Sequence, residues 1–485
     1  MEFEAVVGLE IHVELNCATK MFCDCPNSTG DEPNRNTCPL CLWFPGAIPK
    51  FSEEALEKAA MTALGLNCSL QELSAFDQKV YYYPDLPKGF QLSQAHFPLA
   101  RNGWLDIMSK NGQPTRLRIH KIHMEEDVAK LVHEMEGRTP ISLVDFNRAG
   151  VPLVEIVTEP DMRGAHDAME FIRNLRTQIR YMGTSDCSME SGTMRVDANI
   201  SLRPHGSDEL NTKVEVKNMN SIRHLGDAIS FEIQRQAASL RSGEPIILHT
   251  RLWDPEKRVT VPMRTKFEGP CIPDPSVASI MITETWKEEL RSRLPEMPGH
   301  KAARFCRDYG LAKDDAVMIS AERDASEYFE AVVKEGIAPR IVTHWIATQF
   351  FPALRERNQS VTNTPVTPVR FAELLAMLEK DEINANAAKD VLVHLFESDE
   401  TPSALVKQFG FKQLSDTAQL DKIVSDVLEA NPSAVSDYQN GNAKAMGFLM
   451  GKAMQASQGK ANPKLIKEIL TNALSKRMSQ EPTAR

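Results

Sequence analysis

The sequence predicts an α+β protein in which a β-rich domain precedes an all-helical domain and a small helical tail domain. Residues 6–15, VVGLEIHVEL, alternate apolar and polar side chains, which is the period of a half-buried strand. The same alternation recurs before residue 290, between turns rich in Gly, Pro and Asn. After Pro295 the apolar residues follow the period of a helix instead. We therefore expect domains at residues 1–294, 295–407 and 408–485.

The elements of the first domain can be placed in order along the chain. Helices are predicted where an apolar stripe follows a capping residue or ends at a glycine, and strands where apolar and polar residues alternate. The expected helices are 52–66, 164–183 and 223–243, and the expected strands are 6–15, 151–160, 196–202 and 213–217. A loop at 357–370 interrupts the helical domain.

The composition is that of a soluble globular protein, with 42% hydrophobic and 25% charged residues. A chain of 485 residues is too long for a single hydrophobic core. The formal net charge of −10 argues against indiscriminate nucleic-acid binding but leaves room for a local basic patch. The sequence holds no run of 18 apolar residues, and its acidic start does not resemble a secretion signal. We expect a cytoplasmic protein without a membrane span.

Four of the nine cysteines lie close together in the segment FCDCPNSTGDEPNRNTCPLC. Two thiol pairs on either side of a turn-rich loop suit tetrahedral zinc, and a site with four sulfurs is closed and therefore structural. We expect a zinc module at about residues 17–45, with the ligands Cys23, Cys25, Cys38 and Cys41. The alternative is four unrelated thiols. The other five cysteines show no such spacing and are expected to be packing residues: Cys17, Cys68, Cys187, Cys271 and Cys306.

The polar faces of the predicted strands are rich in carboxylates. Residues 6–15 place two glutamates around His12, and the segment HKIHMEEDVAK adds further acids and two histidines. The polar residues that share this pattern are Glu10, His12, Glu14, Glu125, Glu126, Glu155, Glu159, Asp197, Lys213, Glu215 and Lys217. Like charges this close repel unless a cation lies between them, and Mg²⁺ binds through carboxylates, waters and substrate phosphates. The alternative is a solvated sheet face, which fits any single strand better than it fits four.

No familiar phosphate-binding loop occurs in the sequence. The nearest string to GxxxxGK[ST] is GFLMGKA, which is one residue short and ends in Ala, and no GxGxxG follows a strand. A nucleophile elbow, GxSxG, is absent as well. A nucleotide site must therefore consist of a metal ion, side chains and loop amides, because phosphoryl transfer needs mainly positioning and charge neutralisation.

Several stretches together resemble one family, in order and along nearly the whole chain. They are VVGLEIHVEL, KMFCDCPNSTGDEPNRNTCPLC, YYYPDLPKGFQLSQ, IHKIHMEEDVAKL, SLVDFNRAGVPLVEIVTEPD, SDCSMESGTMRVDANISLRP, TKVEVKNMNSI and AMGFLMGKAMQASQGKANPKLI. They resemble the B subunit of the tRNA-dependent amidotransferases. The resemblance implies a cradle domain with kinase and transamidase activity, a helical domain, and a tail domain that binds tRNA. It also implies a heterotrimer with an amidase, the A subunit, which releases ammonia from glutamine, and with a small C subunit.

The activity that the resemblance implies is that of a glutamine-hydrolysing carbon–nitrogen ligase. ATP would phosphorylate the side-chain carboxylate of Glu-tRNA(Gln), of Asp-tRNA(Asn) or of both, and ammonia would then displace phosphate, with Mg²⁺ neutralising charge. The resemblance assigns metal and kinase roles to Glu10, His12, Glu125, Glu126 and Glu155. The expected Mg²⁺ ligands are Glu10, His12, Glu125 and Glu155. Glu126 is expected to contact these ligands without binding the ion itself. Asp197, Lys213 and Lys217 are expected either to line the nucleotide pocket or to be plain surface residues.

The sequence departs from the family in one segment. Members carry a stretch of the type Asp-Tyr-Arg-Tyr-Phe-Pro after a Met-Arg pair, whereas here PMRTKFEGPCIPDPSVASIMI is shorter and lacks the Tyr-Arg pair. An arginine there would clamp phosphate, so we expect the substrate contacts of this segment, near residues 266–276, to differ from the usual ones.

Two other functions fit parts of the sequence. One is a non-catalytic, zinc-bearing scaffold that binds tRNA, and the other is a stand-alone metal-dependent hydrolase. Residues 436–477 carry five more basic than acidic side chains, which is either a solvated helical surface or a patch that meets phosphates. The substitution Glu125→Gln discriminates, because a scaffold would tolerate it and a kinase site would not.

Overall fold

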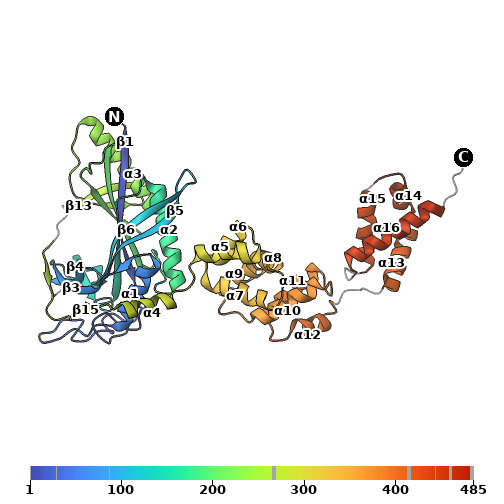
Figure 1. Cartoon of the computed structure of the whole chain (residues 1–485), viewed down its shortest axis with the longest axis horizontal. Helices are drawn as coiled ribbons and strands as arrows, with labels where there is room; N and C mark the ends of the chain where they lie inside the picture. The colour runs from blue at the N-terminus through green and yellow to red at the C-terminus, as the bar shows by residue number, and fades with distance from the viewer. Residues whose placement is uncertain are drawn as a thin grey trace. The chain divides into compact units, whose positions relative to one another are not determined.

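The computed structural model describes residues 2–480 except 29, 87, 265–268, 412–416, 443 and 458–460. The chain divides into two compact units, Met1–Met297 and Pro298–Arg485. Every strand of the described residues lies in the first unit, and the second unit is helical (Figure 1). The predicted α+β class is therefore confirmed.

A nine-stranded sheet forms the centre of the first unit, with strand order β13-β12-β11-β10-β1-β9-β6-β5-β2. Neighbouring strands run antiparallel except β11 and β12, which are parallel. The strands are β1 (Phe3–Glu14), β2 (Ser69–Leu70), β5 (Ala100–Met108), β6 (Pro114–Glu126), β9 (Pro152–Thr158), β10 (Met194–Pro204), β11 (Val214–Met219), β12 (Thr250–Asp254) and β13 (Val259–Arg264). The four predicted strands are thus β1, β9, β10 and β11, which lie side by side near the middle of the sheet.

Two smaller sheets complete the β structure of the described residues. Strand β3 (Leu73–Val80) pairs with β4 (Phe90–Phe97) and also with β14 (Cys271–Pro273) and β15 (Ile280–Met281). Strands β7 (Lys130–Glu136) and β8 (Thr139–Asp145) form a separate hairpin. Because β4 packs against β6, the sheet around β3 brings its polar side chains to the face of the large sheet where β6 ends. The segment that departs from the family includes residues 265–268, which lie outside the described residues.

The helices of the first unit are α1 (Glu53–Gly65), α2 (Ala165–Met182), α3 (Ile222–Ser242) and α4 (Glu284–Arg293). The three predicted helices are present, and their ends follow from local chemistry. The hydroxyl of Ser52 accepts a hydrogen bond from the backbone of α1, and that of Ser221 accepts one from the backbone of α3. Gly183 ends α2 at φ +73°, a left-handed conformation that glycine adopts without strain.

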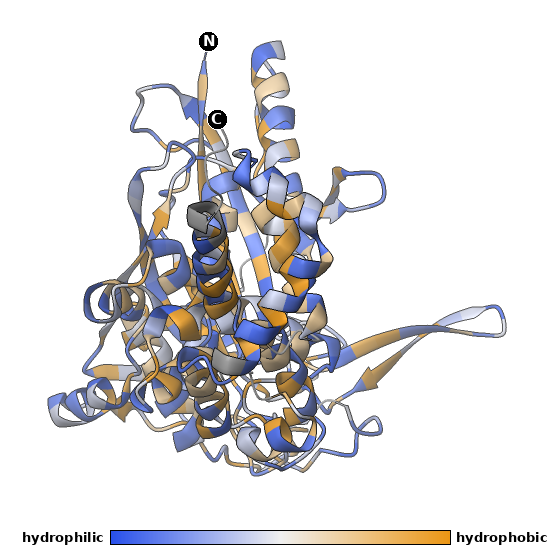
Figure 2. Ribbon diagram, turned by 90° about the vertical axis from the view of Figure 1, so that its right-hand side faces the viewer, coloured by the Kyte–Doolittle hydropathy of each residue, from blue (hydrophilic) through white to orange (hydrophobic). Residues whose placement is uncertain are grey.

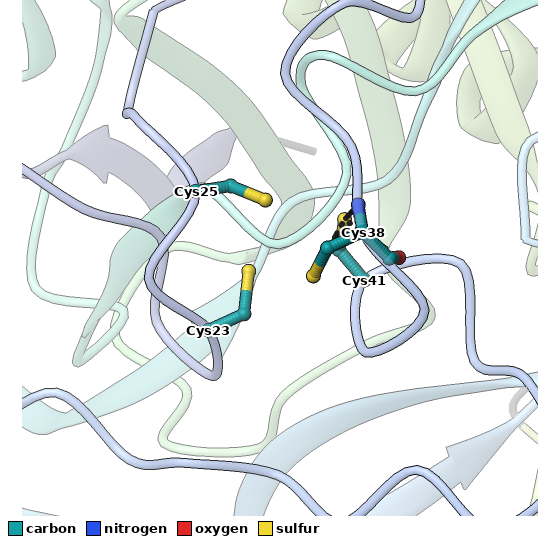
Figure 3. Close-up of side chains that lie close together, drawn as sticks. All are labelled: Cys23, Cys25, Cys38 and Cys41. Atoms are coloured by element: carbon teal, nitrogen blue, oxygen red, sulfur yellow. Dashed lines mark hydrogen bonds between the residues drawn. The ribbon is translucent and has the colours of Figure 1, made fainter.

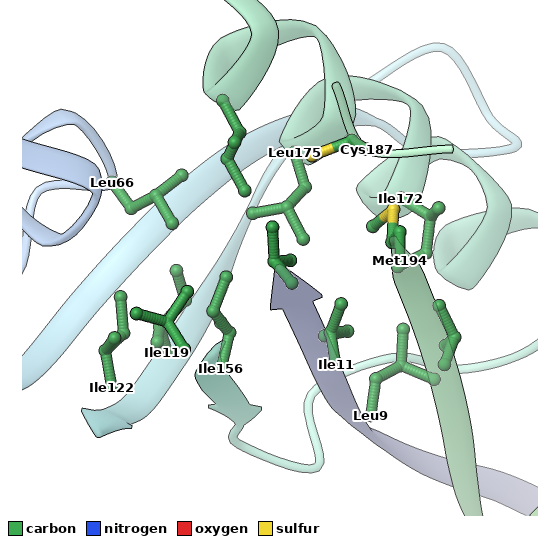
Figure 4. Close-up of a cluster of buried hydrophobic side chains, with 14 of the residues drawn as sticks. Leu9, Ile11, Leu66, Ile119, Ile122, Ile156, Ile172, Leu175, Cys187 and Met194 are labelled. Carbon is green, nitrogen blue, oxygen red and sulfur yellow. The ribbon is translucent and has the colours of Figure 1, made fainter. Parts of the chain in front are cut away.

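One face of the large sheet is covered by hydrophobic residues of these helices (Figure 4). Leu9 and Ile11 of β1 are buried there beside Ile156 of β9, and Ile172 and Leu175 of α2 pack over them. Each such side chain contributes on the order of 1.5–3 kcal/mol when fully buried. Because side chains alternate along a strand, burial of this face turns the intervening polar residues of β1 toward the opposite face.

The second unit consists of helices that are mostly short. They are α5 (Pro298–Tyr309), α6 (Lys313–Ser320), α7 (Arg323–Lys334), α8 (Pro339–Trp345), the π-helix η1 (Ile346–Phe350), α9 (Phe351–Glu356), α10 (Pro368–Glu379), α11 (Ala385–Leu395), α12 (Pro402–Gln408), α13 (Thr417–Ala430), α14 (Pro432–Gln439), α15 (Lys444–Ala456) and α16 (Pro463–Gln480). Helices such as these carry hydrophobic residues along one side and hydrophilic residues along the other (Figure 2).

The hydrophobic residues of the second unit form two separate clusters, one within residues 302–406 and one within residues 420–474. We keep the division of this unit near residue 407 as a proposal, which these clusters support. Among the described residues, none of the helices combines the length and hydropathy required to cross a membrane.

Candidate functional site

The polar side chains predicted from the strand alternation form rows across the open face of the large sheet. In one row His123 of β6 lies opposite Glu155 of β9, and Glu155 lies opposite His12 of β1. On its other side, His12 lies opposite Arg195 of β10. Directly opposed residues of an antiparallel pair point to the same side of the sheet. Four strands therefore contribute one side chain each to this row.

Two further rows lie beside the first. Glu10, two residues before His12, lies opposite Asp197. In the next row Asn199 of β10 lies opposite Glu215 of β11, and Glu215 lies opposite Thr250 of β12. The acidic side chains of β1, β10 and β11 are thereby brought within reach of one another.

His12, Glu125 and Glu155 form the first group of potential metal ligands, with ligand atoms that all lie within 4.8 Å of one another. The Nε2 atom of His12 lies 3.6 Å from Glu125 Oε2 and 3.8 Å from Glu155 Oε2. Ser93 donates a hydrogen bond of 2.6 Å to Glu125 Oε1. His123 Nε2 lies 2.8 Å from Glu155 Oε2 and 3.1 Å from Glu125 Oε1, and therefore orients both carboxylates.

These buried carboxylates are ionised because cationic groups surround them. Burial alone would raise the pKa of Glu155, but His123 and His12 outweigh it and lower the pKa to about 2. Burial would lower the pKa of His12, yet Glu155 and Glu125 raise it to about 9. Burial also opposes ionisation of Glu125, and Lys79 and the histidines nevertheless hold its pKa well below the usual value. A divalent cation fits here, since two carboxylates and an imidazole meet within 4.8 Å and its charge would balance theirs.

Glu10, Asp197 and Glu215 form the second group, whose ligand atoms also lie within 4.8 Å of one another. Asn199 donates a hydrogen bond of 2.9 Å to Glu10 Oε1, and Thr250 donates one of 2.6 Å to Glu215 Oε2. Three carboxylates with oriented oxygens are a donor set that suits Mg²⁺.

Lys217 lines the cavity and also contacts the carboxylates of the second group. Its ammonium forms an ion pair with Asp197 and lies 3.6 Å from Glu215 Oε1. Lys217 therefore balances part of the negative charge of this group.

Both groups reach one cavity of about 570 Å³, the first through His12 and Glu125 and the second through Asp197. The charged side chains along its wall are His12, Lys79, Glu125, Asp127, Arg195, Asp197 and Lys217. This volume is in the range of cavities that hold cofactors and small substrates. Of the acids on the predicted strand faces, Glu125 and Asp197 line this cavity, whereas Glu10, Glu155 and Glu215 are not part of its wall.

The structure separates Glu10 from His12, and it leaves Glu126 and Lys213 outside both acidic groups. The sequence predicts one site for Glu10 and His12, but Glu10 lies in the second group, because β1 pairs with different strands on its two sides. Glu126 belongs to neither group, since its carboxylate forms an ion pair with Lys88 and accepts a hydrogen bond of 2.8 Å from the Leu92 amide. Lys213 is exposed just before β11 and does not line the cavity, which agrees with the surface alternative expected for it.

Sequence reasoning gives no site role to several side chains that the fold brings to the acidic groups or to the cavity. Glu215 alternates with valines in KVEVK, and Arg195 precedes Asp197 by two residues, so the strand period could have indicated both. Lys79 and Ser93 come from β3 and β4, and no pattern in the sequence places those strands against β6.

The four clustered cysteines meet as predicted, with sulfur atoms that all lie within 4.8 Å of one another (Figure 3). The backbone amide of Cys38 donates a hydrogen bond of 3.2 Å to the sulfur of Cys41. Lys20 is fully buried nearby, where its ammonium donates hydrogen bonds to the carbonyls of Asn36 and Phe146 and interacts electrostatically with the Cys41 sulfur. Four thiolates beside a buried cation fit a closed structural zinc site.

Comparison with known families accounts for most of the chain. Residues 5–288 match the family model described as the GatB/GatE catalytic domain, and residues 327–474 match the one described as the GatB domain. The first match contains the large sheet and both acidic groups, which defines the class of this unit as a GatB/GatE catalytic domain.

Relatives that match along nearly the full length of the chain assign it to a family more specifically. The chain is 65% identical to a B subunit, the one numbered 1, of the aspartyl/glutamyl-tRNA(Asn/Gln) amidotransferase of Syntrophus aciditrophicus, over 98% of this chain and 99% of the relative. It is 43% identical to the B subunit of Carboxydothermus hydrogenoformans and 44% identical to that of Persephonella marina, again over 98% of this chain and 99% or more of each relative. The chain belongs to the family of B subunits of aspartyl/glutamyl-tRNA(Asn/Gln) amidotransferases.

Proposed function

We propose that the cavity phosphorylates the side-chain carboxylate of Glu-tRNA(Gln), of Asp-tRNA(Asn) or of both at the expense of ATP, and then amidates it. The observation that carries this proposal is the meeting of two acidic groups and three cations, Lys79, Arg195 and Lys217, around one cavity. Acidic side chains alone would repel a triphosphate, so metal ions and cations have to accompany it. The names of the relatives support the choice of substrates.

His12, Glu125 and Glu155 would hold one Mg²⁺ ion, and Glu10, Asp197 and Glu215 a second. Bound there, Mg²⁺ would neutralise the charge that builds up on the transferred phosphoryl group. The chain's own residues orient this ligand set: His123 and Ser93 fix the first group, and Asn199 and Thr250 fix the second, as described above. Lys217 lies beside the second group and is placed to meet phosphate oxygens.

The chemistry balances in two steps. A carboxylate oxygen of the aminoacyl side chain attacks the γ-phosphorus, the bond to the bridging oxygen of ADP breaks, and an acyl phosphate forms. Ammonia then attacks the carbonyl carbon, phosphate leaves, and a proton is released to give the amide. The first step requires no nucleophile from the chain, because the substrate supplies it.

We propose that ammonia comes from an amidase, the A subunit, and that a small C subunit completes the heterotrimer. The tail domain, which carries the basic excess of residues 436–477, would bind the tRNA, and zinc would occupy the four-cysteine site. The designation of the relatives as B subunits supports an assembly of several subunits.

The test is reconstitution of the chain with A and C subunits and measurement of ATP- and Mg²⁺-dependent conversion of Glu-tRNA(Gln) to Gln-tRNA(Gln). A control with free ammonia in place of glutamine isolates the two steps proposed for this chain, phosphorylation and amidation, from glutamine hydrolysis. A mixture that assembles but consumes no ATP with either nitrogen source contradicts the proposal and leaves the alternative, a non-catalytic zinc-bearing scaffold that binds tRNA.

A further inference from the structure

Arg195 lies on the wall of the cavity, but its ion pair is with a residue of neither acidic group. It lies opposite His12 in the strand register and two residues before Asp197 on the same side of β10. The residue therefore stands between a member of the first acidic group and a member of the second, on the wall of the cavity. Its side chain is 39% exposed.

The three cations of the cavity differ in the carboxylates they contact. Lys79 lies 3.8 Å from Glu125 of the first group, and Lys217 pairs with the second group. Arg195 instead forms an ion pair with Asp127, which belongs to neither group. A metal ion that binds either group competes with Lys79 or Lys217 for the carboxylates of that group. Arg195 does not face this competition, because its partner Asp127 belongs to neither group.

Asp127 is fixed firmly enough to position an arginine. Its side chain is 4% exposed, and its backbone is hydrogen-bonded on both sides, from its amide to Val151 and from Gly150 to its carbonyl, each at 2.9 Å. The guanidinium of Arg148 lies 3.5 Å from the same Asp127 oxygen that Arg195 contacts.

The guanidinium of Arg195 still has donor capacity left. Within the described part of the chain its Nε atom is buried and has no hydrogen-bond partner, although its Nη2 atom is engaged by Asp127. A guanidinium offers five N–H donors in a planar fork, which matches two oxygens of one phosphoryl group. Because the side chain is 39% exposed on the cavity wall, the Nη donors that do not meet Asp127 can reach a ligand oxygen there.

We propose that Arg195 binds phosphoryl oxygens of the nucleotide, with Asp127 as its positioning residue. This inference rests on the proposed function, because it concerns the same cavity. The fork of Arg195 meets the polyphosphate between the two metal-binding groups, and Asp127, which belongs to neither group, holds it there.

The experiment uses the full chain assembled with its partner subunits and calorimetric titration with ATP, ADP and adenosine in the presence of Mg²⁺. Hydrogen bonds to charged groups correspond to about 10- to 100-fold in affinity. Arg195→Gln should therefore weaken ATP binding by about that factor and leave adenosine binding unchanged. Arg195→Lys, which keeps the charge but loses the fork, should show a smaller loss and guards against a failure of the Gln variant to fold.

The positioning role of Asp127 is tested by a double-mutant cycle with Arg195. Asp127→Asn should weaken ATP binding alone, but in the double variant with Arg195→Gln it should add nothing. Arg203→Gln is the matched control, because Arg203 also lies on β10 and forms an ion pair, with Glu4, outside the cavity. We expect Arg203→Gln to bind ATP like the wild type.

Unchanged ATP affinity in Arg195→Gln, or an equal loss for adenosine, overturns the role of Arg195. A loss seen only in the KM for aminoacyl-tRNA also overturns it and points to the substrate carboxylate or a tRNA phosphate. If the wild-type assembly itself binds no ATP, the proposed function falls as well, which distinguishes the two failures.

Discussion

Glu10 and His12 are two residues apart on the same face of β1, yet they belong to different groups of potential metal ligands. Residues two apart on a strand are separated by roughly 6.6 Å, which is more than the reach of one metal coordination shell. His12 turns to Glu125 and Glu155, whereas Glu10 turns to Asp197 and Glu215. One strand thus serves two adjacent sites, and the substitutions below separate them.

Removal of one charge in the first group should abolish catalysis. Glu125→Gln keeps the size of the side chain but loses the carboxylate that His12, His123 and Lys79 surround. We expect ATP-dependent amidation by the assembled enzyme to fall by on the order of 10³-fold. The matched control is Glu134→Gln on the exposed hairpin, which should retain full activity. Near-normal activity of Glu125→Gln would favour the scaffold function.

The two groups should bind metal independently. Titration with Mn²⁺ followed by electron paramagnetic resonance should show two classes of bound ion in the wild type. Glu155→Gln should remove one class and Glu215→Gln the other, because each loses one ligand of its group. Glu159→Gln, just beyond β9, pairs with His120 and should leave both classes intact. Loss of both classes in either variant would show that the groups form a single site.

The four-cysteine site should control which thiols react. Burial raises the pKa of Cys17, Cys68 and Cys187 to about 12 in each case, so these thiols should stay unreactive in the folded protein. Zinc should protect the four clustered thiols as well. Alkylation should therefore modify the half-buried Cys271 and Cys306 first, and four more thiols only after chelation of the metal. Equal modification with and without the chelator would contradict a metal site.

Glu14 should make the stability of the protein depend on pH. Burial, together with the neighbouring Asp127 carboxylate, raises the pKa of Glu14 to about 7. A raised pKa favours the protonated folded form, so its contribution is present below about pH 4.5 and is lost as the pH rises through 7.

Glu14→Gln cannot ionise and should escape that loss. Relative to the wild type it should be equally stable near pH 4.5 and more stable at pH 8, by on the order of 1–3 kcal/mol. Urea unfolding at both pH values, with metal removed, measures the difference. A stability advantage of the same size at both pH values would show that Glu14 acts through packing instead.

The sequence predicted which residues lie on the open face of the sheet more accurately than it predicted how those residues divide into two groups of metal ligands. The alternation of polar and apolar residues in β1, β9, β10 and β11 was sufficient to show that their acids share one side, because that pattern is local. The separation of Glu10 from His12 depends on register with strands more than a hundred residues away. Such pairing is set by the whole sheet.

The helices were predicted well for a similar reason. Ser52, Ser221, Gly183 and Gly243 lie next to the ends they determine, so the signals are in the local sequence. Lys79 and Ser93 could not be found, because the sheet around β3 reaches the site only through tertiary packing. Glu126 was expected to support the metal ligands, but it pairs with Lys88 because it faces the opposite way to its neighbour Glu125 along the strand.

The position of β1 in the sheet has a consequence for biosynthesis. This strand leaves the ribosome before its two partners, Pro152–Thr158 and Met194–Pro204, which begin about 140 and 180 residues after its end. Closing such long loops is slow, and an unpaired strand with one apolar face is prone to aggregate meanwhile. We therefore expect β1 to stay without its two partner strands until translation has passed residue 204, where the second of them ends.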